Sequence, residues 1–195
     1  MGWGRGEYNF LQRCNWSYSE VPSFRWIENV QVNSLVISRL EYCNSLLNDI
    51  PKYQRDKLQR IQNTAARMTT GARSSDHITP LLKSLHWLPV EARIHFKILL
   101  ITYKILNGQS AGYLEPLIKD YHPTRAIQSS SRSLVCTPAI KSKTYGGRTF
   151  STAAPQLFIT TPEYIKNADS VATFKTKLKT FLFRKWFNWF SYLTF

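Results

Sequence analysis

One stretch limits the fold of this chain more than any other, because it is long, apolar and bounded by helix-ending residues. It is residues 86–108, with the sequence HWLPVEARIHFKILLITYKILNG. Pro89 suits the start of a helix, and Gly108 suits its end because glycine readily takes a left-handed cap. Apolar residues recur at helical spacing around most of the circumference: Val90, Ile94, Ile98, Leu99, Leu100, Ile101, Tyr103, Ile105 and Leu106. Such a helix belongs inside a bundle, with His86-Trp87-Leu88 forming the turn before it.

The same stretch does not predict a membrane-spanning helix. Arg93, Lys97 and Lys104 interrupt it, and its longest clean apolar run is Ile98–Tyr103. A span needs about 20 apolar residues. The N-terminus also lacks the apolar segment of a secretory signal. The expectation is an intracellular protein, in the cytoplasm or the nucleus, without signal peptide or transmembrane helix.

Weaker periodicity predicts helices before this stretch. Apolar side chains repeat every three or four residues over 29–48, where Pro51 follows. A second helix is expected over 52–70, with Gly71 as its C-terminal cap and one apolar stripe: Leu58, Ile61, Ala65 and Met68. A short helix follows, with Thr79 as its N-cap.

Two further helices are expected after the central one. GRTFSTAAPQLF (147–158) is predicted to be helical up to Pro155, and Ser170 to cap the last helix. The apolar stripe of that helix is Val171, Phe174, Leu178, Phe181 and Leu182. At 100° per residue, Lys175 and Lys179 flank one side of the stripe, and Lys177 and Arg184 the other.

These elements predict a mainly α fold: a small helical bundle with a Ser/Thr/Pro-rich connector that has room for one short β-hairpin near Leu134–Thr137. The expected organisation has five parts. They are an irregular extension (1–30), a helical bundle (31–119), a basic connector (120–146), a basic helical segment (147–185) and an aromatic tail (186–195).

The charge of the chain indicates an anionic partner. The net charge is +14 and the pI about 9.9, and 11 basic against two acidic residues fall within 121–195. A surplus of this size attracts polyanions, of which nucleic acid is the commonest, although many such residues simply form solvated helix faces. The candidate nucleic-acid-binding residues are Lys57, Arg60, Arg67, Lys141, Lys143, Arg148, Lys175, Lys177, Lys179 and Arg184.

The sequence offers no recognisable catalytic or metal site. The five aspartates are isolated from one another, and no two acidic residues are adjacent, whereas a two-metal polymerase site needs clustered carboxylates. Phosphate-binding glycine loops and nucleophile motifs are also missing. His86 is expected to shape the turn before the long helix, with its imidazole bonded to backbone groups. No catalytic residue, metal ligand or small-molecule substrate is predicted.

Several stretches, in this order, resemble one family. They are SRLEYCNSLL (38–47), LQRIQNTAARMTTG (58–71), DHITPLLKSLHWLPVEARIHFKILLITYKILNG (76–108), KTYGGRTFSTAAP (143–155) and SVATFKTKLKTFLF (170–183). The series is similar to the C-terminal part of the polyprotein of jockey-like non-LTR (LINE-type) retrotransposons, downstream of the reverse-transcriptase palm. It covers about residues 34–185. Residues 1–30, the segment after Pro155 and the tail after Lys185 depart from the family.

The resemblance implies a thumb region and a basic C-terminal extension, with RNA or an RNA/DNA primer–template and the missing palm domain as partners. The palm motif Phe/Tyr-x-Asp-Asp, which holds catalytic Mg²⁺ in the family, does not occur here. No catalytic residue and no cofactor therefore carry over to this chain, although the full-length enzyme would use Mg²⁺. The expected function is that of a truncated remnant of an RNA-directed DNA polymerase, which binds nucleic acid and is inactive alone.

Two alternatives remain at the level of the sequence. Residues 170–195 combine a basic amphipathic helix with an aromatic tail, which is typical of a membrane-surface or protein-interaction module. A domesticated host protein with its own partner is the other.

Overall fold

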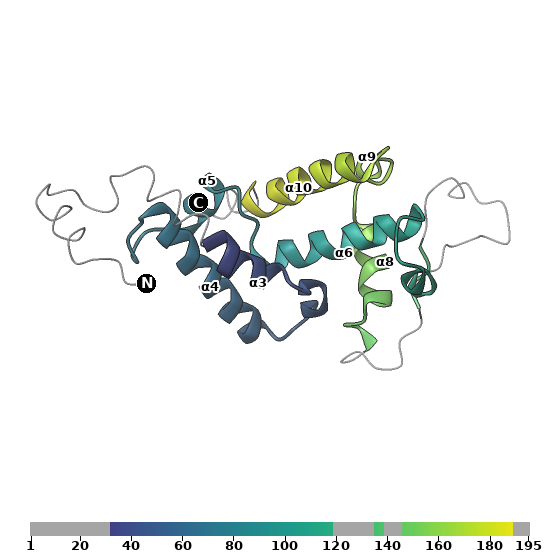
Figure 1. The fold of residues 1–195 in the computed structure, drawn as a ribbon, viewed down its shortest axis with the longest axis horizontal. Coiled ribbons are helices and arrows are strands. Elements are labelled where there is room, and N and C mark those ends of the chain that lie inside the picture. The colour runs from purple at the N-terminus through teal and green to yellow at the C-terminus, as the bar shows by residue number, and fades with distance from the viewer. Residues whose placement is uncertain (1–31, 119–134, 139–145, 189–195) are drawn as a thin grey trace, which may run out of the picture.

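The computed structural model describes residues 32–118, 135–138 and 146–188 (Figure 1). Regular structure within these residues is helical throughout, so the predicted mainly α fold is confirmed. In chain order the elements are η1 (Asn33–Ile37), α3 (Ser38–Glu41), η2 (Asn44–Leu47), α4 (Lys52–Thr70), α5 (Ile78–Ser84), α6 (Val90–Leu106), η3 (Gly112–Leu117), α8 (Phe150–Ile159), α9 (Glu163–Lys166) and α10 (Val171–Asn188). The predicted extension (1–30) and most of the connector lie outside the described residues. So does Leu134, where the predicted β-like run begins.

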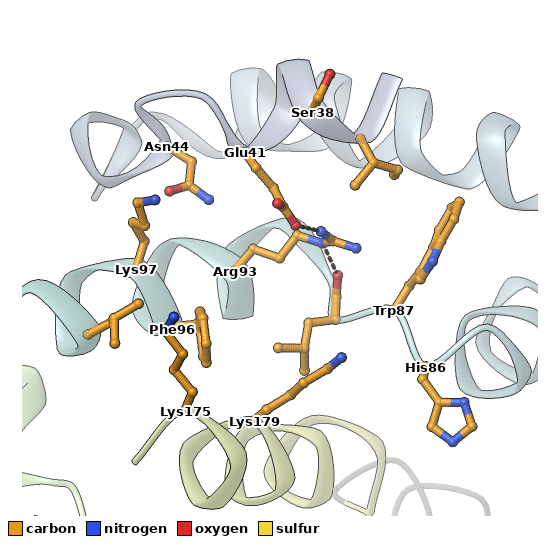
Figure 2. A pocket seen from close by; sticks show the side chains of 13 residues that line it. Ser38, Glu41, Asn44, His86, Trp87, Arg93, Phe96, Lys97, Lys175 and Lys179 are labelled. Atoms are coloured by element: carbon orange, nitrogen blue, oxygen red, sulfur yellow. Dashed lines mark hydrogen bonds and ion pairs between the residues drawn. The ribbon is translucent and has the colours of Figure 1, made fainter. Parts of the chain in front are cut away.

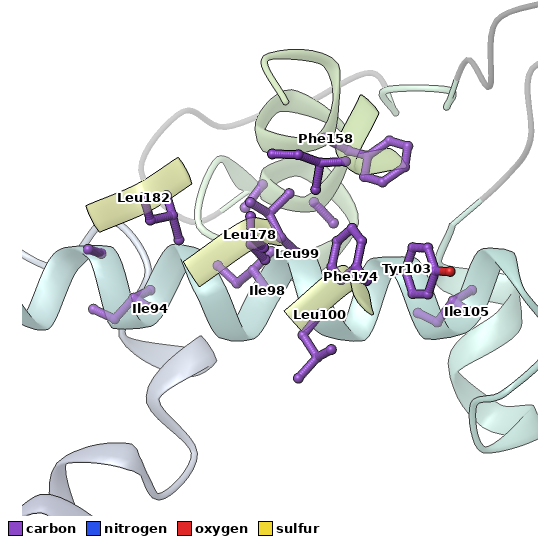
Figure 3. Close-up of a cluster of buried hydrophobic side chains, with 14 of the residues drawn as sticks. Ile94, Ile98, Leu99, Leu100, Tyr103, Ile105, Phe158, Phe174, Leu178 and Leu182 are labelled. Carbon is purple, nitrogen blue, oxygen red and sulfur yellow. The ribbon is translucent and has the colours of Figure 1, made fainter. Parts of the chain in front are cut away.

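Helix α6 is the centre of the molecule, as its sequence predicts. It begins directly after Pro89 and ends before Gly108, whose φ of +63° is the left-handed conformation expected of a C-terminal cap. Helix α10 packs along it and α8 crosses it, and the three share the main hydrophobic core (Figure 3). Most of the α6 residues that the sequence predicts to be internal are buried in this core.

The main core joins segments that are far apart in the sequence. Phe174 of α10 stacks on Tyr103 of α6 with ring centroids 4.0 Å apart. The Tyr103 hydroxyl donates a hydrogen bond to the Ala168 carbonyl oxygen, just before α10 begins. The Thr173 N–H donates to Ser170 Oγ at 3.1 Å, which confirms Ser170 as the cap of α10.

A second, smaller core lies beneath the turn between α5 and α6. It contains Val32, Ile37, Ala65, Ala66, Leu82, Trp87 and Phe187. Helix α10 therefore continues past Lys185, and Phe187 belongs to the folded interior. The turn is covered on its inner side by α4 and by the end of α10.

The predicted helix over 29–48 is confirmed only in part. Residues 32–41 are helical, with the π-helical η1 running directly into α3, but the helix breaks at Tyr42 and Cys43, before the 3-10 turn η2. The break occurs because Tyr42 is extended and Cys43 has a left-handed φ of +49°. Leu35, one of the regularly spaced apolar residues of this segment, is 70% exposed. Asn44 points inward instead.

The predicted buried stripe of α4 is also partly wrong. Ala65 is buried, but Ile61 is 50% and Met68 65% exposed. The buried positions of the helix are Gln62, Ala65, Ala66 and Thr69. The helix is rotated because Gln62 makes a buried hydrogen bond to the turn before α6, which an apolar stripe does not anticipate. Gly71, with φ +68°, caps the helix as predicted.

Two helix boundaries differ from the prediction. Helix α5 starts at Ile78 with His77 as its N-cap, so Thr79 is not the cap and Pro80 is the third helical residue. Proline costs nothing there because the first four N–H groups of a helix have no internal partner. Helix α8 continues through Pro155 to Ile159. Because Pro155 is fully buried in the interior, packing retains the helix despite one lost backbone hydrogen bond.

No strand forms among residues 135–138 and the other described residues, so the hairpin for which the prediction left room is not seen in them. Val135 is buried in the main core.

Candidate nucleic-acid interface

The turn at residues 86–89 is held in place by glutamines of α4. Gln62 Nε2 donates to the Leu88 carbonyl oxygen at 2.8 Å, and Gln62 is completely buried. Gln59 Oε1 accepts a hydrogen bond from the Val90 N–H at 3.0 Å, which satisfies one of the free donors at the start of α6. The turn therefore has a fixed orientation relative to α4.

An ion pair connects the same turn to α3. The Arg93 guanidinium pairs with the Glu41 carboxylate, and Arg93 Nε donates to the Leu88 carbonyl oxygen at 2.8 Å. Burial lowers the pKa of Arg93, while the charge and the hydrogen bond of Glu41 act in the opposite direction. Glu41 therefore offsets part of the cost of burying this arginine, and its own charge is neutralised by the pair.

A cleft of about 630 Å³ opens between α3, η2, the start of α6 and one side of α10 (Figure 2). Its walls are partly aromatic, from Trp87 and Phe96. Asn44 and Glu41 reach into it from η2 and α3, and Lys175 and Lys179 reach into it from α10.

The cleft is strongly basic. Among the residues that the structure describes, four cationic side chains line it, and Glu41 is the one carboxylate. Because Glu41 is paired with Arg93, the remaining cations face the cleft without compensation. These are Lys97, Lys175 and Lys179, and none of them has an ion-pair partner among the described residues. Uncompensated ammonium groups around a concave surface attract a phosphate chain.

The structure divides the predicted residues of α10 between two sides of the helix. Lys175 and Lys179 line the cleft. Lys177 lies on the other flank, where its Nζ donates to the Tyr164 carbonyl oxygen at 3.3 Å. Arg184 is exposed. The helical-wheel assignment of Lys175 and Lys179 to one flank is confirmed.

The other predicted basic residues that the structure describes do not line the cleft. Lys57 and Arg60 are exposed on α4, with the Lys57 ammonium 5.8 Å from the Tyr53 ring centroid. Arg67 is partly buried and its Nη2 donates to the Asp76 carbonyl oxygen at 3.2 Å. Arg148 precedes α8. Lys141 and Lys143 lie outside the described residues.

Three residues of the cleft were missed by reasoning from the sequence: Asn44, Arg93 and Lys97. The two basic residues carry a signal that could have identified them. They are four positions apart on a predicted helix, and therefore mark one polar face of an otherwise apolar element. Asn44 carries no comparable signal, since its position depends on the break at Cys43.

Among the described histidines, His86 and His95 pack against aromatic side chains of α10. The His86 imidazole is exposed and stacks on Phe183 with ring centroids 5.9 Å apart, so the predicted bonding of its ring to the backbone is not what holds it. His95 lines a second cavity of about 500 Å³ together with Arg55 and Glu91. Burial lowers the pKa of His95 to about 4, and the charges of Lys185 and Arg55 add to this. His95 is therefore neutral at pH 7.

The described residues contain no group of three or more His, Cys, Asp or Glu side chains that could hold a metal ion. Among the same residues, no helix combines the length and the apolar character needed to cross a membrane.

Comparisons of the chain with protein families, with characterised proteins and with solved structures give no match. The functional proposal therefore rests on the cleft and on the resemblance between sequence motifs.

Proposed function

We propose that this chain is a helical nucleic-acid-binding module, corresponding to the thumb-like region that follows the palm in non-LTR retrotransposon reverse transcriptases. The observation that carries the proposal is the gathering of Lys97, Lys175 and Lys179 around one cleft, while its carboxylate is neutralised by Arg93. The ordered series of motifs shared with the family is the second support.

The physical basis of binding would be phosphate neutralisation. Each ammonium group that pairs with a phosphate releases a condensed counterion, so affinity falls steeply with salt. The three lysines come from α6 and α10, whose packing against each other is fixed by the main core. The positions of their backbones are therefore set before binding, whereas the exposed lysine side chains still lose rotamer freedom when they pair with phosphates.

The module is proposed to be inactive as a polymerase by itself. Phosphoryl transfer by this class of enzyme requires carboxylates that hold two metal ions, and the chain has no adjacent acidic pair. Its partners would be RNA or an RNA/DNA primer–template and the palm that carries the catalytic aspartates.

A membrane-surface or protein-interaction role for residues 170–195 has less support. The apolar stripe of α10 that would enter a membrane includes Phe174, Leu178 and Leu182, and these side chains are buried in the main core. Co-sedimentation with vesicles containing anionic phospholipid, at matched salt, would revive this alternative if the folded chain bound them more tightly than RNA.

The binding test compares two sets of three substitutions that remove equal charge. The cleft variant removes the three lysines of the cleft: Lys97→Ala/Lys175→Ala/Lys179→Ala. The control variant removes three exposed cations of α4: Lys52→Ala/Lys57→Ala/Arg60→Ala. Binding to labelled single-stranded RNA is measured over a salt series. The cleft variant should lose affinity and show a salt dependence shallower by about two in log–log slope, at roughly 0.7 per lost phosphate contact.

Equal losses in both variants would show that binding follows net charge and not the cleft. Salt-independent binding, or none, would contradict the proposal itself. DNA synthesis by the purified chain from primed RNA, dNTPs and Mg²⁺ would contradict the proposed inactivity.

A further inference from the structure

Helix α4 exposes three large apolar side chains to solvent. Tyr53, Ile61 and Met68 are 61%, 50% and 65% exposed. The buried positions of the same helix hold small or polar residues: Gln62, Ala65, Ala66 and Thr69. Single exposed apolar residues are ordinary on a protein surface, whereas a series of them on one face marks an interaction site.

The exposed apolar residues have the spacing of a contact between two helices. The side chains along the outer face of α4 are all exposed, and together we call them the outer seam: Tyr53, Lys57, Ile61, Thr64 and Met68. Successive members are three or four residues apart, which keeps them on one stripe, as in paired helices. At 1.5 Å per residue the outer seam is roughly 23 Å long, which matches a partner helix of about 16 residues.

Positive charge lies within and beside the outer seam. The Lys57 ammonium lies 5.8 Å from the Tyr53 ring centroid, and the exposed Arg60 follows three residues later. Neither cation forms an ion pair with Asp56, the single acidic residue of α4, or with any other described residue. A partner helix would pair both cations with carboxylates three or four residues apart, as charged residues beside a coiled-coil seam do.

This chain cannot supply such carboxylates to the outer seam. Its two most closely spaced acidic residues, Glu115 and Asp120, are five positions apart. No segment of the chain therefore offers two acidic residues three or four positions apart on one helix face, and neither does a second copy. Two copies joined seam to seam would also bring Lys57 and Arg60 against like charges. The complementary charge has to come from a different molecule.

A membrane surface and a phosphate chain are less suited to the outer seam. A helix that lies on a membrane has a continuous apolar face, whereas Lys57 and Thr64 alternate with the apolar residues here. A phosphate chain would pair with the two cations and leave Ile61 and Met68 in water. A protein helix can satisfy both kinds of residue.

From these features we infer that the outer seam of α4 docks an amphipathic helix of another protein, which carries apolar residues along its seam and acidic residues beside them. The apolar side chains of the two helices would exclude water from one another, as in helix-in-groove recognition. No member of the outer seam lines the cleft. The inference therefore goes beyond the proposed function and can fail without it.

The first test uses three labelled helical peptides of about 20 residues, long enough to cover the outer seam. The first has a leucine seam with glutamate beside it, the second the same seam with lysine beside it, and the third glutamate beside a glutamine seam. Fluorescence anisotropy with the full chain should show the first peptide binding at least about tenfold more tightly than either control. Equal affinity for the first peptide and either control would overturn the inference.

The second test changes the outer seam. Ile61→Gln/Met68→Gln should weaken binding of the first peptide about tenfold while retaining helix propensity. The matched control is Leu46→Gln/Tyr113→Gln, because these side chains are 79% and 78% exposed in other elements. Lys57→Glu/Arg60→Glu should make the chain prefer the lysine peptide. Unchanged binding by Ile61→Gln/Met68→Gln, or an unchanged preference after the charge reversal, would overturn the inference.

The remaining outcomes identify other roles for the outer seam. Ile61→Gln/Met68→Gln should match the natural chain in its urea midpoint, its sedimentation velocity, and its binding of single-stranded RNA and of anionic phospholipid vesicles. A lower midpoint would show that the outer seam supports the fold. Loss of self-association would point to a second copy, and weaker RNA or vesicle binding to those ligands. Each of these results would overturn the inference. If the chain binds RNA but not the first peptide, this inference falls and the proposed function stands.

Discussion

At the scale of single residues, buried polar side chains organise the part of the molecule that carries the cleft. Gln62 and Arg93 both donate to the Leu88 carbonyl oxygen, at 2.8 Å each. One backbone acceptor therefore holds side chains from α4 and α6. Because both donors are shielded from water, neither contact can be replaced by solvent without rearranging the turn.

Gln62→Ala should lower the free energy of unfolding by about 1–3 kcal/mol, because it leaves the Leu88 carbonyl short of one buried donor. The matched control is Gln54→Ala on the same helix, since Gln54 is exposed and bonds only its neighbour Tyr53. That change should be nearly neutral. Urea denaturation followed by circular dichroism measures both. Equal effects would mean that helix propensity, and not the buried contact, dominates.

His95 makes stability depend on pH. Its pKa is lowered from 6.5 to about 4, chiefly by burial. Since the folded value lies below the unfolded one, the unfolded chain binds the extra proton between these values. The contribution of His95 is therefore complete above pH 6.5 and is lost as pH falls toward 4, by at most about 3 kcal/mol.

His95→Gln should flatten the decline in stability between pH 6.5 and 5, measured as urea midpoints. His77→Gln is the control, because His77 is exposed. A His95→Gln chain with the same decline as the natural chain would refute this assignment.

These residue-scale features were the least accessible from the sequence. A pattern of apolar residues predicts which positions avoid water, but it does not predict that Gln62 or Asn44 will be buried. Burial of an amide becomes favourable only when another segment supplies its partner, and that partner is 26 residues away for Gln62. The apolar pattern therefore predicted that Ile61 and Met68 lie on the buried face of α4, whereas Gln62 lies there.

At the scale of elements, local signals succeeded where they were strong. Pro89 and Gly108 bound α6 as predicted, and Ser170 caps α10, because these signals act within one helical turn. They failed at α8, where burial outweighed the helix-breaking effect of Pro155. They also failed at Cys43. This residue has a left-handed backbone, which is usually found at glycine or asparagine, so nothing in the sequence indicates the break.

Ser170→Ala should destabilise the chain by about 1 kcal/mol, because the Thr173 N–H loses its acceptor at the start of α10. Ser170→Asp should retain stability, since a carboxylate accepts the same hydrogen bond and favours the helix N-terminus. Ser84→Ala is the control. Its hydroxyl donates to the Leu81 carbonyl oxygen near a helix C-terminus and caps nothing. Melting temperature by circular dichroism should fall by about 2–4 °C in Ser170→Ala alone.

At the scale of the whole molecule, one main core unites residues on either side of the connector. Phe174→Ala removes a completely buried ring that stacks on Tyr103, and should cost about 3–5 kcal/mol. Tyr164→Ala on α9 is the control, because that ring is exposed. Amide hydrogen exchange should show reduced protection in both α6 and α10. Undiminished protection of α6 would indicate that residues 32–118 fold independently of α10.

The contact between α6 and the segment just before α10 can form only late in synthesis of the chain. The Tyr103 hydroxyl bonds a carbonyl 65 residues further along the chain. At about 5–20 residues per second, a ribosome needs roughly 3–13 s to make that length. Helix α6 is therefore complete seconds before α10, which packs along it, has been made. During that interval it is the segment on which a chaperone, or aggregation, would act first.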